Sequence, residues 1–410
     1  MIRITHNMMK NDVVYNIETH QENLDRLQNN LSTGKKVRIP RENPISATNA
    51  MLYRTRIEEI KKFIDNIEEG EARLNFAENG IRSIVDIFHR LEELVVQGAN
   101  GIYSKEDREK IAVEVDELLK EVVQIANSKF KGESIFAGYQ TNIEPFEVLK
   151  TKPAFADREV ITKVLYKGDI GKNLRELEQQ EYAPVNLAGN VLFWATNEVV
   201  IGNQDVSNYV ANKNHKIRID GKEILIQSGD NINAIIEKIN NANITVRASL
   251  RDNQFVIETT SPHELWIEDI EGGTFFQDIG LKIANQRPNE FANNVQKIGY
   301  NIFDVIIKIR DDLWKNDVAS LGSEDLNNLQ HSLNNLLTGL GEIGARSARF
   351  LSVKKRLNMN EVDMTDILSK TENIDIAKTV MDLQMLEYIH RSALAVGARI
   401  IRPTLIDFLR

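Results

Sequence analysis

The sequence predicts a mainly α-helical protein in which a β-rich domain is inserted between the two halves of one elongated helical bundle. Apolar residues recur every three or four positions over roughly the first 130 residues and again after Asn285. Between about Ile135 and Ile283, short β-branched or aromatic runs alternate with Gly, Asn and Pro. Each terminal apolar stripe is only one helix wide and needs a partner, so we expect both ends of the chain to meet.

The first helix is expected to carry a coiled-coil stripe, because its apolar positions fall alternately four and three residues apart. These positions are Val13, Ile17, His20, Leu24, Leu27 and Leu31. Gly34 predicts the helix end, and the loop with Pro40 and Pro44 marks a break. A second helix of roughly 50 residues should follow from about Ile45, a length typical of bundles rather than of compact enzyme cores.

A third helix is predicted from Ser104 to about Ser128. Ser104 is a suitable N-cap, and Glu106 and Asp107 behind it favour the positive end of the helix dipole. Its apolar face repeats every three or four residues from Ile111 to Ile125.

A hairpin is the strongest signal of the β-rich region. Alternating apolar runs at 216–219 and 224–226 flank Asp220-Gly221, and these two residues tolerate the positive φ angles of a type I′ turn. Asp230 is expected to cap a short helix, after which two more strands are predicted at 244–250 and 254–258. Residues 215–260 would thus form a small ββαββ module.

Helical spacing returns after Asn285. One helix is expected to contain Val295 and the apolar residues from Ile302 to Leu313, and Ser323 is a plausible cap for the next. The last helix, from about Ile374 to before Pro403, has a seam of small and apolar residues. The seam consists of Ala377, Met381, Met385, Tyr388, Ser392 and Ala395.

Composition excludes several classes of function. A net charge of -9 and a pI near 5.5 argue against a nucleic-acid partner, which requires clustered surplus cations. The chain has no Cys, so disulfides, thiolate nucleophiles and thiol zinc sites are absent. No apolar run is long enough for membrane insertion, and Met1 to Asn16 does not resemble a cleaved signal peptide.

One short motif suggests a nucleotide site. Gly339-Leu340-Gly341-Glu342-Ile343-Gly344 matches the dinucleotide-binding pattern, and Asp363 follows at about the usual distance. However, a helical stripe precedes the motif where a strand is required. We therefore interpret these glycines as close-packing points or a kink between helices.

The titratable residues do not form a recognisable catalytic or metal site. The seven histidines are scattered, and His20, at an apolar heptad position, is better explained as a buried or register-setting residue than as a ligand. Four carboxylates beside basic residues are interpreted as solvated helix-surface charge: Glu92, Glu93, Asp116 and Glu117. The basic cluster Lys35, Lys36, Arg38 and Arg41 is interpreted as a solvated or ion-paired loop. The sequence therefore predicts no enzyme, cofactor or metal.

Several segments resemble the bacterial flagellin family, including its hook-associated members. The N-terminal segments are Ile2 to Met9, Leu31 to Lys36, Asn43 to Ala47, Gln97 to Gly101 and Phe136 to Gly138. The C-terminal segments are Gly344 to Arg346, Asp375 to Ala377 and Ser392 to Ala398. The tail from Arg402 to Leu409 looks more like hook-filament junction proteins than filament flagellins. The ββαββ module, with Ile239-Asn240 closing its helix, is similar to the IN module of hook-associated proteins.

The resemblance implies a structural flagellar subunit that forms a ring with copies of itself and joins the hook to the filament. It implies hook-side and filament-side partner proteins, a flagellar export chaperone, and an extracellular or periplasmic flagellum reached without a cleaved signal peptide. The implied divisions are 1–44 and 366–410 as terminal assembly helices, 45–140 and 286–365 as two halves of a helical shaft, and 141–285 as a β-rich outer domain.

The expected assembly interface lies on the two terminal helices and the tail. It comprises Val13, Ile17, Leu24, Leu27, Leu31, Met381, Met385, Tyr388, Ala395, Leu405 and Phe408. Three alternatives remain open: a filament flagellin, an envelope enzyme suggested by Gly339 to Gly344, and a secreted adhesin suggested by Phe193 and Trp194.

Overall fold

The protein is described by a computed structural model that covers residues 6–37, 39–153, 158–282, 291–292 and 295–400. The chain divides into two compact units. The first unit contains residues 1–65 and 354–410, and the second contains residues 66–353. Two long helices, α2 (Pro44–Ala99) and α9 (Leu326–Glu372), contribute residues to both units.

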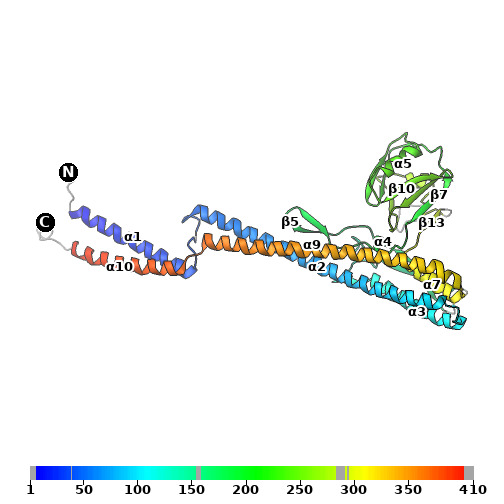
Figure 1. Ribbon diagram of the computed structural model, residues 1–410. Coiled ribbons are helices and arrows are strands. Elements are labelled where there is room, and N and C mark those ends of the chain that lie inside the picture. Colours follow the sequence, from blue (N-terminus) through cyan, green and yellow to red (C-terminus); the bar gives the residue numbers. More distant parts are fainter. Residues whose placement is uncertain (1–5, 38, 154–157, 283–290, 293–294, 401–410) are drawn as a thin grey trace. The chain divides into compact units, whose positions relative to one another are not determined.

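The first unit pairs the two ends of the chain. Helix α1 (His6–Thr33) lies alongside α10 (Ile376–Ile400), at the blue and red ends of the ribbon in Figure 1. Gly34 ends α1 at a φ of +72°, and its N–H donates to the Asn30 carbonyl at 2.8 Å. The predicted meeting of the terminal helices is therefore confirmed, as is the mainly α fold with a β-rich middle.

The helical part of the second unit is built around α3 (Lys105–Ala126) and α7 (Ile302–Lys315), which pack side by side. Ser104 caps α3 as predicted, because its side chain accepts the Asp107 N–H at 3.2 Å. After α7 come α8 (Val318–Ser320) and a π-helical turn, η1 (Leu321–Asp325). The prediction that Ser323 is a cap is wrong: Asp317 caps α8, and Ser323 lies inside the π turn, where its hydroxyl donates to Ala319.

Between α3 and α7, the first part of the connecting chain packs on the helices. It contains three hairpins and a short helix: β1 (Lys129–Phe130), β2 (Glu133–Ser134), β3 (Phe146–Thr151), β4 (Val160–Tyr166), β5 (Leu174–Glu178), β6 (Glu181–Pro184) and α4 (Gly189–Leu192). Strand β4 contacts α7, and Phe146 and Phe193 stack around Phe303 of α7 at centroid distances of 5.0 and 5.7 Å. This hydrophobic cluster explains why these hairpins stay with the helices.

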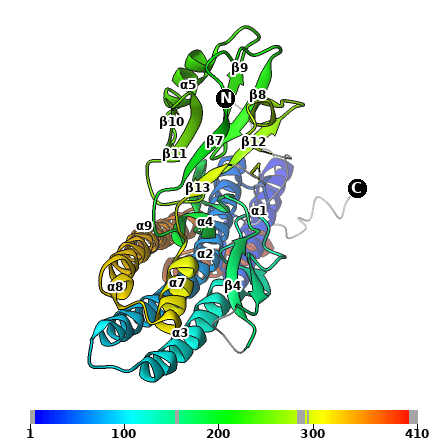
Figure 2. The same cartoon turned by 90° about the vertical axis from the view of Figure 1, so that its right-hand side faces the viewer.

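The second part forms the β domain, residues 199–298, whose described residues build two sheets around a core of their own (Figure 2). One sheet has the order β10-β11-β7-β13, from β10 (Val246–Arg251), β11 (Gln254–Thr259), β7 (Val199–Asp205) and β13 (Gln296–Ile298). The other has the order β12-β8-β9, from β12 (Ile267–Ile270), β8 (His215–Ile219) and β9 (Lys222–Ile226). Helices α5 (Ile232–Asn240) and α6 (Phe275–Asp278) complete it.

The predicted hairpin is confirmed. Asp220 and Gly221 have φ angles of +46° and +82° between β8 and β9, as a type I′ turn requires. The ββαββ order is also found, but its two hairpins belong to different sheets, and β7, β12 and β13 are needed to complete them.

Other details of this region differ from the sequence prediction. Asn231, not Asp230, caps α5 by accepting the Ala234 N–H at 2.9 Å, while Asp230 binds Lys238. Val295 does not belong to the next helix, because it packs against the core of the β domain. Strand β13 pairs with β7 beyond the predicted boundary at 285, because a three-residue strand carries too little periodic signal to be recognised.

Two adjacent segments of the chain connect the β domain to the rest of the second unit. Trp194 and Asn301 form an antiparallel bridge. Next to it, the Tyr300 carbonyl accepts the Ala195 N–H at 2.9 Å, and the Tyr300 N–H donates to the Thr196 hydroxyl at 3.0 Å. The chain thus enters and leaves the domain at one place.

Candidate assembly surface

The α1 half of the predicted interface faces α10 within the same chain. Leu24 is buried at 6% exposure, and Val13, Ile17, Leu27 and Leu31 are half-buried. A Cβ placed on Gly397 of α10 would lie 3.2 Å from side-chain atoms of both Val13 and Ile17. The apolar heptad stripe therefore contributes to the pairing of the two terminal helices.

The α10 half of the predicted interface points away from α1. Met381, Met385 and Tyr388 are 63%, 66% and 74% exposed, and Ala395 is exposed as well. The residues of α10 buried in the pair include Thr379 and Gly397. At about 100° per residue, Met381 lies roughly 160° around the helix from Gly397. We call the exposed residues Met381, Met385, Tyr388 and Ala395 the α10 stripe.

The sequence alone does not distinguish the contact face of α10 from its exposed face, because a small-residue seam and an apolar stripe have the same period on one helix. The actual contact face of α10 includes a glycine and a threonine, which a search for large apolar residues overlooks. Leu405 and Phe408, the last two predicted interface residues, lie outside the described part of the chain.

A cluster of charged residues lies in the first unit, where α1 ends and α10 begins. The buried carboxylate of Glu372 forms ion pairs with Lys35 and Arg54. Burial alone would raise the pKa of Glu372, but the hydrogen bonds from Lys35 and Arg54 outweigh it and lower the pKa below its usual value. Backbone hydrogen bonds from Lys36 to Glu372 (2.8 Å) and from Ile374 to Gly34 (3.0 Å) fix the same junction. The interpretation of Lys35 as an ion-paired loop residue is confirmed.

A second charge cluster, in the second unit, corrects the prediction for Asp116. Its side chain is 1% exposed, and one carboxylate oxygen lies 2.9 Å from Nη1 of Arg310, which is fully buried. Arg158 and Lys120 approach the other oxygen at 3.1 and 3.0 Å. Arg310 also donates to the Ile161 carbonyl at 2.8 Å and so ties α3, α7 and β4 together. No single-helix pattern reveals a partner so far away in sequence.

Arg108 fixes the end of the helical part in a similar way. Its guanidinium donates to the Gly98 and Asn100 carbonyls at 2.7 and 2.9 Å, and to the Asn316 side chain at 2.8 Å. It thus satisfies carbonyls at the C-terminus of α2 while holding the turn after α7.

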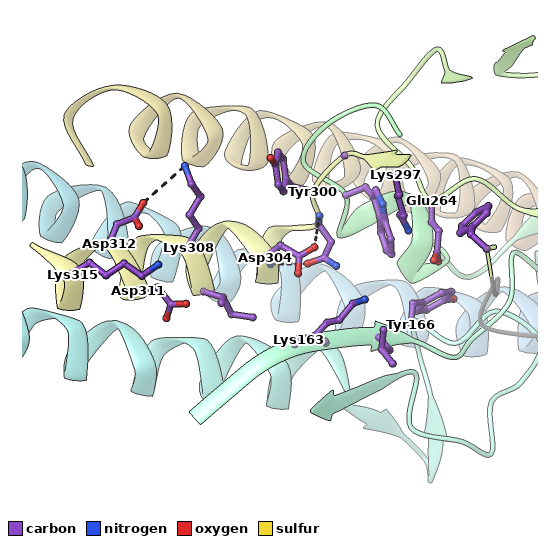
Figure 3. Close-up of a pocket in the computed structure, with 17 residues that line it drawn as sticks. Lys163, Tyr166, Glu264, Lys297, Tyr300, Asp304, Lys308, Asp311, Asp312 and Lys315 are labelled. Atoms are coloured by element: carbon purple, nitrogen blue, oxygen red, sulfur yellow. Dashed lines mark hydrogen bonds and ion pairs between the residues drawn. The ribbon is translucent and has the colours of Figure 1, made fainter. Parts of the chain in front are cut away.

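One groove of the second unit is lined by charges of both signs. It encloses about 740 Å³ along α7 and β4 and includes Lys163, Lys297, Lys308, Lys315, Glu264, Asp304, Asp311 and Asp312 (Figure 3). Lys308 is held by Glu324 and Asp325 at 2.8 and 3.0 Å, and Lys297 by Glu198 at 3.0 Å. Lys297 and Lys308 are thus engaged by carboxylates of the chain itself, and this part of the groove is a salt-bridged surface.

Asp312 of this groove has a raised pKa. Burial and the charge of nearby Asp325 raise its pKa to about 6, while Lys308 opposes the shift. Asp325 is the last residue of the π turn, directly before α9, and is 1% exposed. The charge of Asp325 thus acts across the contact between α7 and η1 on the carboxyl group of Asp312.

The residues that suggested an enzyme or an adhesin occupy positions that a structural role explains. Gly339 to Gly344 lie inside α9, where no helix N-terminus is available for a phosphate, and a Cβ on Gly339 would lie 2.4 Å from Leu192. Phe193 and Trp194 are 0% and 4% exposed and offer no surface to a ligand. Among the described residues, no three His, Asp or Glu side chains gather as metal ligands. None of the described helices has the length and apolarity needed to cross a membrane.

Comparison with known proteins identifies the class of the N-terminal region. Residues 4–141 match the family model of the bacterial flagellin N-terminal helical region. The chain thus contains a flagellin-type N-terminal region, and the resemblance noted in the sequence is confirmed for these residues.

Individual relatives belong to flagellar filaments and hooks. A Treponema maltophilum protein named "Flagellar filament 30.7 kDa core protein" is 34% identical over 120 residues, or 28% of this chain and 42% of that protein. "Flagellar hook-associated protein 3" of Salmonella typhimurium is 26% identical over 147 residues, or 36% of this chain and 46% of that protein. These matches therefore span less than half of each relative. The flagellar junction protein FlgL from Legionella pneumophila gives a TM-score of 0.45 at 18% identity, covering 80% of this chain and 100% of that one.

Proposed function

We propose that this protein is a structural subunit of the bacterial flagellum, a ring-forming adaptor that joins the hook to the filament and performs no catalysis. The observation that carries the proposal is that the terminal helices pair with each other and leave the α10 stripe exposed. The flagellin-type N-terminal region of the chain supports it. Isolated large apolar side chains are normal on surfaces, but a continuous row on one helix face indicates a contact with another chain.

In this proposal, α1 and α10 first pair within each subunit through Leu24 and its neighbours. The α10 stripe then packs against adjacent copies of the chain and against hook-side and filament-side proteins. Burying each large side chain would contribute roughly 1.5 to 3 kcal/mol to assembly. The protein would reach an extracellular or periplasmic flagellum by flagellar export, without a cleaved signal peptide and with an export chaperone on its C-terminal region.

The second candidate is a filament flagellin, and the similarity to the Treponema filament core protein favours it. The junction role is supported by the tail from Arg402 to Leu409, by the IN-like module, and by similarity to a hook-associated protein. Immunolabelling of isolated flagella distinguishes the two. We expect a short labelled zone at the hook end, and label along the whole filament would favour the flagellin.

A deletion strain gives the genetic test of the same proposal. Loss of a junction adaptor should leave hooks in place while filament protein is released unattached. A strain that still carries attached filaments of normal length would exclude the adaptor role.

A further inference from the structure

One cavity of the second unit carries more positive than negative charge, in a chain whose net charge is -9. It encloses about 400 Å³ and is lined by residues of α2, β2, β5 and the segments next to them. Its charged lining consists of Arg73, Lys172, Arg175 and Glu133. Three cations thus share the cavity with one carboxylate, an excess that favours an anionic ligand.

Arg73 forms the buried side of the cavity and engages its one carboxylate. The residue is 8% exposed, and its Nη1 donates to a carboxylate oxygen of Glu133 at 2.7 Å. Its Nη2 donates to the Ser134 carbonyl at 3.4 Å, while its Nε is buried without a hydrogen-bond acceptor among the described residues. Glu133 therefore balances the charge of Arg73 and leaves the other two cations of the cavity unneutralised.

The two outer cations have donors to offer. Lys172 is exposed and forms no ion pair with any residue that the structure describes. The side chain of Arg175 is 44% exposed, and its Nη2 lies 3.7 Å from a carboxylate oxygen of Glu69. This distance is well beyond that of a charge-assisted hydrogen bond, about 2.7 to 2.9 Å. Both side chains can therefore bind an anion without first breaking a strong contact.

Hydrogen bonds fix the backbone on both sides of Lys172. The carboxylate of Asp169 accepts the Gly171 N–H at 2.7 Å. The side chain of Asn186 accepts the Asn173 N–H at 2.8 Å and donates to the Gly171 carbonyl at 2.9 Å. This wall of the cavity is therefore in place before a ligand arrives, which reduces the entropy cost of binding.

An aromatic side chain and a hydroxyl lie in the same lining. Tyr139 is 63% exposed, and its ring lies so close to Gly171 that a Cβ there would clash with it. Thr141 adds a hydroxyl that can donate or accept. The volume falls within the range of small-molecule sites, roughly 300 to 1,000 Å³, and exceeds what a bare phosphate ion would fill.

We propose that this cavity binds a small organic anion of about monosaccharide size, whose phosphate or carboxylate group is held by Lys172 and Arg175. The guanidinium offers two parallel N–H donors to such a group, and the ammonium adds a point charge. The body of the ligand rests on Tyr139 and exchanges hydrogen bonds with Thr141. This binding site is separate from the α10 stripe and does not depend on the flagellar role.

Isothermal titration calorimetry of the full-length protein tests the site with glucose 6-phosphate, glucuronate, inorganic phosphate and glucose as probes. We expect at least one of the two sugar acids to bind more tightly than inorganic phosphate, and glucose not to bind. The tighter sugar acid identifies the anionic group as a phosphate or a carboxylate. Failure of both sugar acids to bind at millimolar concentration, or equal binding of glucose, would overturn the proposal.

The double variant Lys172→Gln with Arg175→Gln tests the position of the site. Affinity for the tighter sugar acid should fall about tenfold for each charge-assisted hydrogen bond lost. Thermal melting should stay close to that of the native protein, because both side chains are exposed. Lys150→Gln with Arg251→Gln removes the same charges at exposed positions outside the cavity and should bind like the native protein. Unchanged affinity in the cavity variant, or an equal loss in the control, would refute the site.

Discussion

The guanidinium of Arg310 and the carboxylate of Asp116 lie 2.9 Å apart, and neither side chain is more than 1% exposed. An ion pair this deeply buried gains little over an apolar pair of similar volume. Its significance lies in what happens when one partner is removed, since the other charge is then left buried.

Removal of the carboxylate should therefore destabilise the helical part of the second unit. We expect Asp116→Ala to lower the free energy of unfolding by about 3 to 5 kcal/mol in urea denaturation. Lys120→Ala is the control, because this exposed partner of the same carboxylate should change stability by less than about 1 kcal/mol. The double variant Asp116→Leu with Arg310→Met should recover most of the loss; no recovery would contradict this account of the pair.

Charges in the α1–α10 pair should separate the terminal helices without unfolding the second unit. Leu24→Asp with Leu27→Asp places two carboxylates in the half of α1 that packs on α10. Buried Leu24 loses roughly 1.5 to 3 kcal/mol of apolar burial, and half-buried Leu27 loses about half as much. We expect trypsin to cleave the terminal helices faster while the main melting transition remains and incorporation at the hook tip stops. The control is Gln21→Asp with Gln28→Asp, which adds the same charges at exposed positions of α1. Global unfolding of the Leu variant would place these helices in a core shared by the whole chain.

The α10 stripe allows assembly to be tested separately from folding. Met385→Asp with Tyr388→Asp changes two side chains that are 66% and 74% exposed, so stability should change by less than about 0.5 kcal/mol. Assembly into the flagellum should nevertheless fail, as measured by the amount of protein on isolated hooks. Met385→Leu with Tyr388→Phe preserves the apolar surface and should assemble. Normal assembly of the Asp variant would exclude this face as an interface.

The raised pKa of Asp312 predicts a pH-dependent contribution to stability. A folded-state pKa of about 6 lies above the unfolded value, so the contribution is fully present below about pH 4 and is lost as the pH rises through 6. We expect the native protein to lose about 1 to 3 kcal/mol more than Asp312→Asn between pH 4.5 and pH 7, because Asn keeps the neutral hydrogen-bond donor toward Asp325. Identical urea midpoints for the two proteins at both pH values would contradict a raised pKa at Asp312.

The β8–β9 turn provides a local test of the inserted domain. Gly221 has a φ of +82°, where a β-branched residue is strongly disfavoured, so Gly221→Val should cost about 1 to 3 kcal/mol. The damage should be confined to the β domain in hydrogen exchange, with α3 and α7 unaffected. Lys222→Val, at the first strand position after the turn, is the matched control. Equal loss of protection in the helices would mean that the domain does not fold as an insertion.

Most of the fold was predictable from patterns among residues close together in sequence. The heptad stripe before Gly34, the Ser104 cap and the Asp220-Gly221 turn each depend on residues close together in sequence, and all three are found in the structure. The two-residue and three-residue strands and the division of the β-rich region were not predictable, because β13 is recognised only through its pairing with β7. The sequence predicted one assembly interface on both terminal helices. It did not separate the α1 residues that face α10 from the residues of α10 that are exposed.

Asp116 shows the limit of single-helix reasoning most directly. Its neighbours Glu117 and Lys120 are exposed, and the periodicity of α3 gives no sign that this acid faces an arginine of α7. The roles of Thr379 and Gly397 were missed for a similar reason. Small residues matter where another helix packs closely, and the local sequence does not show where that happens.

The β domain begins and ends on neighbouring strands, with Thr196 bonded to Tyr300. An insertion attached at one point can change in size, or be replaced by a tight turn, without altering the distance that the supporting chain must span. Residues 199–298 are therefore free to diversify, while the paired termini stay under the constraint of fitting each other. Among related proteins, we therefore expect sequences to differ most in the β domain and least in the terminal helices.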